Sequence, residues 1–304
     1  MTSEQALLPM PGVDMAVHRA RIEEAERRMR RSGWRRHLPR RGHLVLMPVS
    51  IVMVLPFVWM VLTSFMRNSE INRIPPTIWP HHFYTGGYKL VLTSSDFPYW
   101  FLNSLIVSGA AVLAQLVLCS LAGYAFARIQ FRGSGVMLIL LLATALIPFQ
   151  LTVIPTFLIF HYLGLINTLG ALIVPQLTSA LGIYLMYSFF QSFPRELEEA
   201  GRIDGCSRLQ VFWKIVLPLA RPAMAALGII TFIYAWNDLF WPLIAITSSR
   251  TFTVQVGLAT FQGEHVTEWS AVMAGTALTT APVLLVFLAG QRRFVQAITG
   301  AVKG

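Results

Sequence analysis

The stretch EEAGRIDGCSRLQVFWKIVLPLARP, residues 198–222, is the most charged segment in the second half of the chain and lies between two long apolar runs. The acidic side chains Glu196, Glu198 and Glu199 suit the first turns of a helix, where the helix dipole favours negative charge. Gly205 can adopt a positive φ and therefore predicts the end of that helix. A second short helix is expected to follow, ending at Leu217-Pro218. Its apolar residues recur at steps of three and four: Leu209, Phe212, Ile215 and Val216.

Two short helices joined at a glycine corner predict a compact element with an apolar face and a charged rim. Such a surface is typical of a contact with a partner protein. The alternative is a loop that folds back on its own membrane domain, and the pattern alone leaves both interpretations open.

The composition indicates that the apolar runs around this segment span a membrane. Of the 304 residues, 55% are hydrophobic and only 12% are charged, whereas soluble domains carry about 25% charged residues. Apolar runs of about 20 residues are long enough to cross a bilayer as helices. The sequence predicts six such spans, at residues 43–66, 101–125, 136–160, 170–190, 222–246 and 270–290.

The charge distribution predicts the orientation of these spans. The net charge of +10 favours a membrane protein with basic cytoplasmic flanks over a nucleic-acid-binding protein. With the N-terminus inside, 20 of the 24 Lys and Arg residues fall in the predicted cytoplasmic segments, as the positive-inside rule requires. Both termini are therefore expected in the cytoplasm, and the basic segment 1–42 precedes a span too long for a cleavable signal peptide.

Motifs for enzymatic chemistry are missing from the sequence. None of the three lysines, Lys89, Lys214 and Lys303, follows a glycine, so the chain has no P-loop. His81-His82 is interpreted as a polar pair in an outer loop, and we expect no metal site. Cys119 and Cys206 lack metal spacing and fall in different compartments, so no disulfide framework is expected. We expect no catalytic residue and no cofactor bound by this chain.

Polar residues and prolines inside the predicted spans are costly in hydrocarbon unless they face a partner or water. They indicate either a polar pathway between broken helices or hydrogen bonds between helices. The polar residues are Asn103, Gln115, Gln150, Gln176, Asn237 and Asp238, and the prolines are Pro48, Pro56, Pro148, Pro155 and Pro175.

The motif in the opening stretch resembles the EAA coupling loop of ABC importer permeases. It is formed by Glu199-Ala200-Gly201, Gly205, Ile215 and Leu217-Pro218, and it departs from the family pattern at Gly201, where alanine is usual. Further stretches resemble the second, six-span permease subunit of the carbohydrate-uptake branch: NSLIVSG at 103–109, AGYAFARIQFRG at 122–133, GLINTLG at 164–170, AWNDLFWPL at 235–243 and the tail QRRFVQAITGAVKG.

The resemblance covers residues 43–304 and implies an all-α membrane protein with six transmembrane helices, the type I ABC importer permease fold with cytoplasmic coupling helices. It implies a first helix at 43–66, an outer loop at 67–100, a transmembrane domain at 101–290 with the coupling loop at 194–221, and a cytoplasmic tail at 291–304. Relatives in this branch carry maltose-like sugars, disaccharides, other glycosides or glycerol phosphates. The resemblance does not identify which of these solutes this chain transports.

Partners follow from the same resemblance: a second, different permease, two ATPase subunits that hold ATP and Mg, an external solute-binding protein and membrane lipid. Glu199, Ala200, Asp204 and Gly205 are expected at the ATPase contact, Pro218 is expected to set the angle to the fifth span, and the tail from Gln296 to Gly304 can also touch the ATPase.

Four residues are candidates for the solute path: Gln150, Tyr234, Trp236 and Asn237. Residues 67–100 and 247–269, including Trp79, Tyr84 and Phe261, are expected to contact the binding protein.

The alternative functions are a stand-alone secondary transporter, which needs an ionisable group in mid-membrane, and a membrane assembly protein. Asp238 is the only carboxylate well inside a predicted span, near its outer end, which disfavours ion coupling.

Overall fold

The computed structural model describes residues 41–75, 77–93, 95–129, 131–262 and 267–301. Within these ranges the regular structure is helical and no strand is formed, as the sequence predicts. The basic segment 1–42 lies outside the described residues except for its last two, and so do the side chains of the tail beyond Gln291.

The helices follow one another along the described residues with short connections. In chain order they are α2 (Arg41–Thr63), α3 (Asn68–Ile71), α4 (Gly86–Thr93), α5 (Phe97–Arg128), α6 (Ser134–Thr144), α7 (Phe149–Tyr162), α8 (Leu169–Ile173), η2 (Val174–Gln176), α9 (Ala180–Gln191), α10 (Glu196–Ile203), α11 (Arg208–Val211), the π-helical turn η3 (Phe212–Val216), α12 (Leu217–Leu219), α13 (Arg221–Trp236), α14 (Phe240–Ala245), η4 (Ser249–Thr251), α15 (Val254–Ala259) and α16 (Trp269–Ala301).

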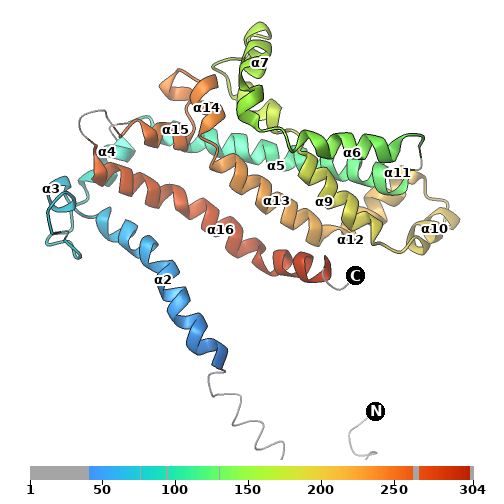
Figure 1. Cartoon of the computed structure of the whole chain (residues 1–304), viewed down its shortest axis with the longest axis horizontal. Helices are drawn as coiled ribbons and strands as arrows, with labels where there is room; N and C mark the ends of the chain where they lie inside the picture. The colour runs from blue at the N-terminus through green and yellow to red at the C-terminus, as the bar shows by residue number, and fades with distance from the viewer. Residues whose placement is uncertain (1–40, 76, 94, 130, 263–266, 302–304) are drawn as a thin grey trace, which may run out of the picture. The chain divides into compact units, whose positions relative to one another are not determined.

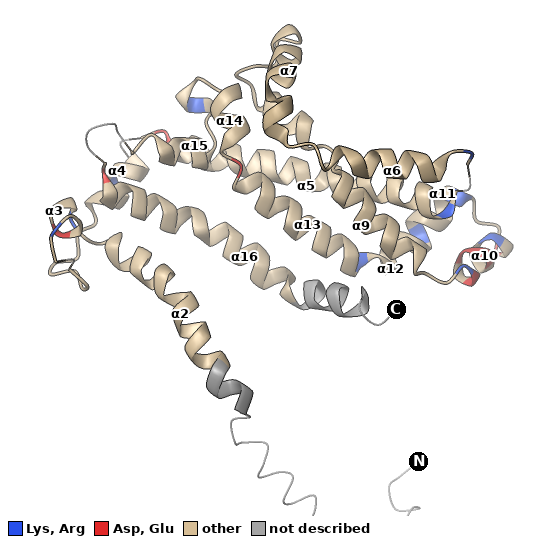
Figure 2. Cartoon of the chain, viewed as in Figure 1, with Lys and Arg blue, Asp and Glu red and all other residues tan. Residues whose placement is uncertain are grey.

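The chain divides into two compact units, Met1–Trp59 and Met60–Gly304. The described part of the first unit is the greater part of α2, an apolar helix with Pro48 and Pro56 inside it. In the second unit, α5 packs along α9 and α13, and α13 packs along α16 (Figure 1). The long helices of this bundle are almost without charge, and charged residues gather around α10 and α11 (Figure 2).

Four helical segments in the described residues are long and apolar enough to cross a membrane, and there are six spans if each of two bent helix pairs counts as one. The four are Leu46–Thr63, Phe97–Arg128, Leu169–Gln191 and Trp269–Gln291, and the bent pairs are Ser134–Thr144 with Phe149–Tyr162 and Arg208–Leu219 with Arg221–Trp236. The fold is therefore the predicted all-α, six-span membrane fold.

The third predicted span, 136–160, is broken into two helices. Helices α6 and α7 meet at an angle of 96°, with Pro148 at the start of α7. Proline disfavours helical geometry in the residue before it and has no N–H to continue the hydrogen-bond ladder. The chain therefore turns sharply in the middle of an uninterrupted apolar run, which hydropathy alone does not reveal.

The predicted span at 222–246 is also shorter than expected, because α13 ends at Trp236. The Asn237 side chain donates to the Ile233 carbonyl at 2.8 Å, which is the local competition with helical hydrogen bonding that asparagine commonly provides. The apolar residues beyond Asp238 form a separate helix, α14. A similar interruption occurs in the fourth span, where η2 with Pro175 separates α8 from α9.

Candidate functional site

The 194–221 loop folds as two short helices because its sequence carries a complete stop and start signal between them. Gly205 has a φ of +83°, and its N–H donates to Arg202 while the Cys206 N–H donates to the Gly201 carbonyl. This pair of bonds is the Schellman motif, which satisfies the last carbonyls of α10. Ser207 then caps α11 in a capping box with Gln210. The predicted glycine corner is confirmed. The Ser207 cap is also visible in the sequence but was not predicted from the motif.

One face of this helix pair folds back on the membrane bundle. Val211, Phe212 and Val216 are buried and form one core cluster with Tyr124 and Phe190, whose rings lie 5.0 and 6.4 Å from that of Phe212. The loop is therefore packed against α5 and α9 rather than held away from them. The inner face of the loop therefore matches the alternative interpretation, in which the loop folds back on its own membrane domain.

The predicted apolar face is partly wrong. Leu209 is 62% exposed and Ile215 is half-buried, while Val211 takes the inward position. A π-helical turn from Phe212 to Val216 changes the spacing of residues that share a face. Pro218 does not end the second helix, because α12 continues to Leu219. The chain bends by 76° between Leu219 and Arg221, after Pro218 has removed one N–H from the ladder.

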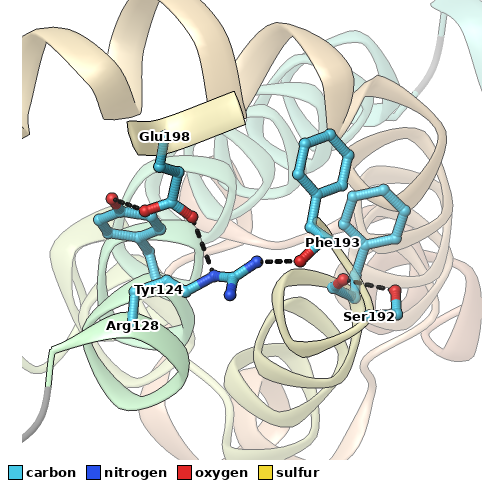
Figure 3. A network of polar contacts seen from close by, with 6 residues as sticks. Tyr124, Arg128, Ser192, Phe193 and Glu198 are labelled. Carbon is cyan, nitrogen blue, oxygen red and sulfur yellow. Dashed lines mark hydrogen bonds and ion pairs between the residues drawn. The ribbon is translucent and has the colours of Figure 1, made fainter. Parts of the chain in front are cut away.

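An ion pair joins this loop to the end of α5. The Nε of Arg128 lies 2.9 Å from Oε1 of Glu198, and their side chains are 7% and 16% exposed. Tyr124 donates its hydroxyl proton to the other carboxylate oxygen of Glu198 at 2.9 Å. The Arg128 guanidinium also donates to the Phe193 carbonyl, just before the loop (Figure 3). Glu198 thus binds two side chains of α5, Tyr124 and Arg128.

Glu198 and Arg128 are functional candidates that the motif comparison did not single out. A signal for them exists in the sequence, since Tyr124 and Arg128 are four residues apart and therefore share one face of a helix. The partner across space could not be identified from this spacing, because three glutamates, at 196, 198 and 199, were available.

The face of the 194–221 loop that points away from the bundle, here called its outer face, is exposed in this chain. Four of the predicted contact residues are exposed: Glu199, Ala200, Asp204 and Gly205. Between them, Ile203 is an apolar side chain that is 86% exposed. The remaining motif residues point inward: Gly201 is buried, and Ile215, Leu217 and Pro218 are half-buried. The motif therefore divides into an inner set that packs the loop and an outer set that, with Ile203, is exposed in this chain.

The residues predicted for a solute path differ in burial. Gln150, Tyr234 and Asn237 are exposed. Trp236 is only 1% exposed, stacks on Phe232 with ring centroids 5.5 Å apart, and donates to the Thr279 carbonyl. The prediction that Trp236 lines an open path is therefore corrected: it is a core residue between α13 and α16.

The opposite end of the bundle carries the predicted outer surface. Trp79 is 63% exposed, Tyr84 is 36% exposed with the Arg67 guanidinium over its ring, and Phe261 packs against Trp100 at 5.9 Å. The Trp100 indole donates to the Ser249 carbonyl at 2.8 Å. These contacts hold the 247–262 part of the outer loop against α5.

Comparisons with known proteins identify relatives of this chain along most of its length. Residues 116–300 match the family described as binding-protein-dependent transport system inner membrane component. The arabinooligosaccharides transport system permease protein AraQ of Halalkalibacterium halodurans is 32% identical over 84% of this chain and 93% of its own length. The lactose transport system permease protein LacG of Rhizobium radiobacter is 33% identical over 85% and 94%. The trehalose/maltose transport system permease protein MalG of Thermococcus litoralis is 33% identical over 84% and 94%.

A solved structure shares the fold. One chain of a bacterial ABC transporter involved in the import of the acidic polysaccharide alginate matches with a TM-score of 0.74 and 23% identity, over 84% of this chain and 99% of that chain. The matched family covers the bundle from the middle of α5 onward, including the whole 194–221 loop. This multi-pass membrane protein therefore belongs to the family of binding-protein-dependent transport system inner membrane components and is a permease subunit of an ABC importer.

Proposed function

We propose that this chain forms half of the transmembrane path of an ATP-driven importer for a sugar or sugar-like solute. Permeases for arabinooligosaccharides, lactose and trehalose/maltose, each similar along most of its length, support this substrate class. In this proposal an external binding protein delivers the solute to the surface around Trp79 and Phe261. A second, different permease supplies the other half of the path.

Two separate ATPase subunits bind ATP and Mg and drive the cycle, since this sequence has no P-loop of its own. One of them docks on the outer face of the 194–221 loop, at Glu199, Ala200, Ile203, Asp204 and Gly205. The exposure of these five neighbouring positions supports the contact. The protein lies in a bacterial inner membrane. Both chain termini and this loop are on its cytoplasmic side, as the positive-inside distribution of Lys and Arg favours.

The single observation that carries the proposal is the buried ion pair between Glu198 and Arg128. It joins a loop with an open outer face to the end of α5, the helix that packs along both α9 and α13. A displacement of α10 by the ATPase is therefore passed to the bundle through a charged contact and not through packing alone. Replacing one partner of a buried pair leaves an uncompensated charge, which costs about 3–5 kcal/mol.

The test uses the complete importer, purified with its ATPase and reconstituted with its binding protein. Glu198→Gln keeps an oxygen that can accept from Tyr124 but removes the charge beside Arg128. We expect less solute imported per ATP hydrolysed, while Glu196→Gln, an exposed position on the same helix, leaves the ratio unchanged. A complex that retains no ATPase in the wild type, or a Glu198→Gln variant with the wild-type ratio, would contradict the proposal.

A further inference from the structure

A cavity of about 520 Å³ lies where two interrupted spans meet the fifth. Thr144 and Ala145, at the break between α6 and α7, form one side of it. Pro175, Gln176 and residues 178–182, around the break between η2 and α9, form another. Tyr234 of α13 stands at its edge. The volume falls within the range of about 300–1,000 Å³ that is usual for small-molecule sites.

The wall of this cavity is fixed by Gln115, whose side chain is only 7% exposed. Its Nε2 donates to the Gln176 carbonyl at 2.9 Å, and its Oε1 accepts from Ser179 at 3.1 Å and from Thr231 at 2.9 Å. Ser179 in turn accepts from the Gly182 N–H at the start of α9. One buried amide therefore joins three elements: α5, the break between η2 and α9, and α13. A hydrogen-bonded network of this kind fixes a unique geometry.

The groups that face the cavity suit a neutral ligand with both hydroxyl groups and apolar faces, because polar side chains lie beside apolar ones such as Leu185, Leu227 and Ile230. None of the described residues that line it is an Asp, Glu, Lys, Arg or His. The side chains of Gln176, Thr178 and Tyr234 form no hydrogen bond within the described part of the chain, and Tyr234 is 81% exposed. Polar side chains within a membrane-spanning bundle must meet water, a partner or a solute. Amide and hydroxyl groups bond sugar hydroxyls, and an aromatic ring offers a flat apolar face to a sugar ring.

We infer that this cavity is a contact site for a neutral carbohydrate, contributed by this subunit to the transport path. Gln176 and Thr178 hydrogen-bond the sugar hydroxyls, Tyr234 packs against the ring, and Gln115 is a positioning residue that holds the break in place. The inference rests on the proposed function and adds to it the residues of this chain that meet the solute.

The test uses the reconstituted importer and, as probe, whichever of maltose, lactose and arabinotriose its binding protein retains. Tyr234→Ala and Gln176→Leu are expected to lower the uptake rate at least about tenfold, while Tyr234→Phe, which keeps the ring, stays within about threefold. Tyr162→Ala removes a tyrosine that is equally exposed, at 85%, but outside this cavity, and is expected to transport normally. In a Cys206→Ser background, the probe is expected to slow thiol labelling of Thr178→Cys.

Distinct results overturn this inference without touching the proposed function. They are wild-type uptake by both the Tyr234→Ala and Gln176→Leu variants, labelling of Thr178→Cys that the probe does not slow, or a binding protein that retains only charged solutes. Loss of the second permease from Tyr234→Ala, but not from Tyr162→Ala, identifies the cavity as a subunit contact and also overturns it. Failure of the proposed function looks different, because the wild-type complex then retains no ATPase and imports no solute.

Discussion

Gly201 and Ile215 hold the two short helices of the 194–221 loop together. A Cβ placed on Gly201 would lie 2.4 Å from Cδ1 of Ile215 and 3.4 Å from Cγ2 of Val211. Helix α10 therefore approaches the π-helical turn as closely as a residue without a side chain allows. The atom in the way is the mobile end of Ile215, so one methyl group can be accepted by a small rotation, whereas a larger side chain must separate the helices.

This contact predicts a graded series of substitutions. Gly201→Ala is expected to retain the ATPase, because the gain of about 0.5–1 kcal/mol in helix propensity offsets the shift of Ile215. Gly201→Leu is expected to displace α10 and abolish retention, and Gly201→Leu with Ile215→Ala is expected to recover part of it. Co-purification of the ATPase with the permease pair measures all three. Retention of the ATPase by Gly201→Leu at the wild-type level would show that the helix pair needs no close contact here.

Gly205 gives a second prediction that separates backbone strain from contact with the partner. No atom lies within 4 Å of a Cβ built on Gly205, so within this chain a substitution costs only its φ of +83°. Alanine pays about 1–2 kcal/mol there, while asparagine tolerates this region. We expect Gly205→Asn to leave the thermal stability of the permease unchanged and still to reduce ATPase retention. If Gly205→Asn retains the ATPase fully and only Gly205→Ala fails, backbone conformation alone is the reason for the glycine.

Trp236 and Tyr234 are expected to respond in opposite ways. Trp236→Ala removes a ring packed against Phe232 and Phe101 and leaves the Thr279 carbonyl without its donor. Truncations of this kind cost about 3–5 kcal/mol. Tyr234→Ala removes an exposed ring and is expected to leave stability unchanged. Thermal unfolding of the detergent-purified permease pair compares them, and equal melting temperatures would contradict the assignment of Trp236 to the core.

Hydropathy and motif spacing predict the class of fold and the place of the loop for reasons that are local. A run of about 20 apolar residues and a helix-ending glycine each act within their own segment. The helix breaks at Pro148 and Asn237 are less visible, because proline and asparagine also occur inside transmembrane helices. Their effect depends on neighbouring segments that supply or withhold hydrogen bonds.

Pairings across space could not be predicted from the sequence. Glu198 meets Arg128 across 70 positions of the chain, and Gln115 meets Thr231 across 116. Its position inside a predicted apolar span marked Gln115 as a costly polar residue, without naming the groups that it bonds. The solute-path prediction failed at Trp236 for a related reason. Residues 234 and 236 lie on different faces of α13, and the packing of α5 and α16 decides which one is buried.

The orientation of the chain predicts which face of the membrane each loop reaches. Cys206 is half-buried in the 194–221 loop and Cys119 is fully buried, so Cys206 is a native probe of that side. We expect an impermeant thiol reagent to label Cys206 only in inverted vesicles. Trp79→Cys, in a Cys206→Ser background, is expected to react only in intact cells. The reverse labelling pattern would invert the proposed topology.

Crosslinking from the outer face of the loop tests the coupling of this permease to an ATPase most directly. A photoreactive amino acid at position 203 replaces Ile203, which is 86% exposed, and the same group at position 211 replaces Val211, which is 1% exposed. On illumination of the assembled importer, we expect position 203 to capture the ATPase subunit and position 211 to form no crosslink with it. Position 203 failing to capture the ATPase in a complex that imports its solute would contradict the assignment of this face as the coupling surface.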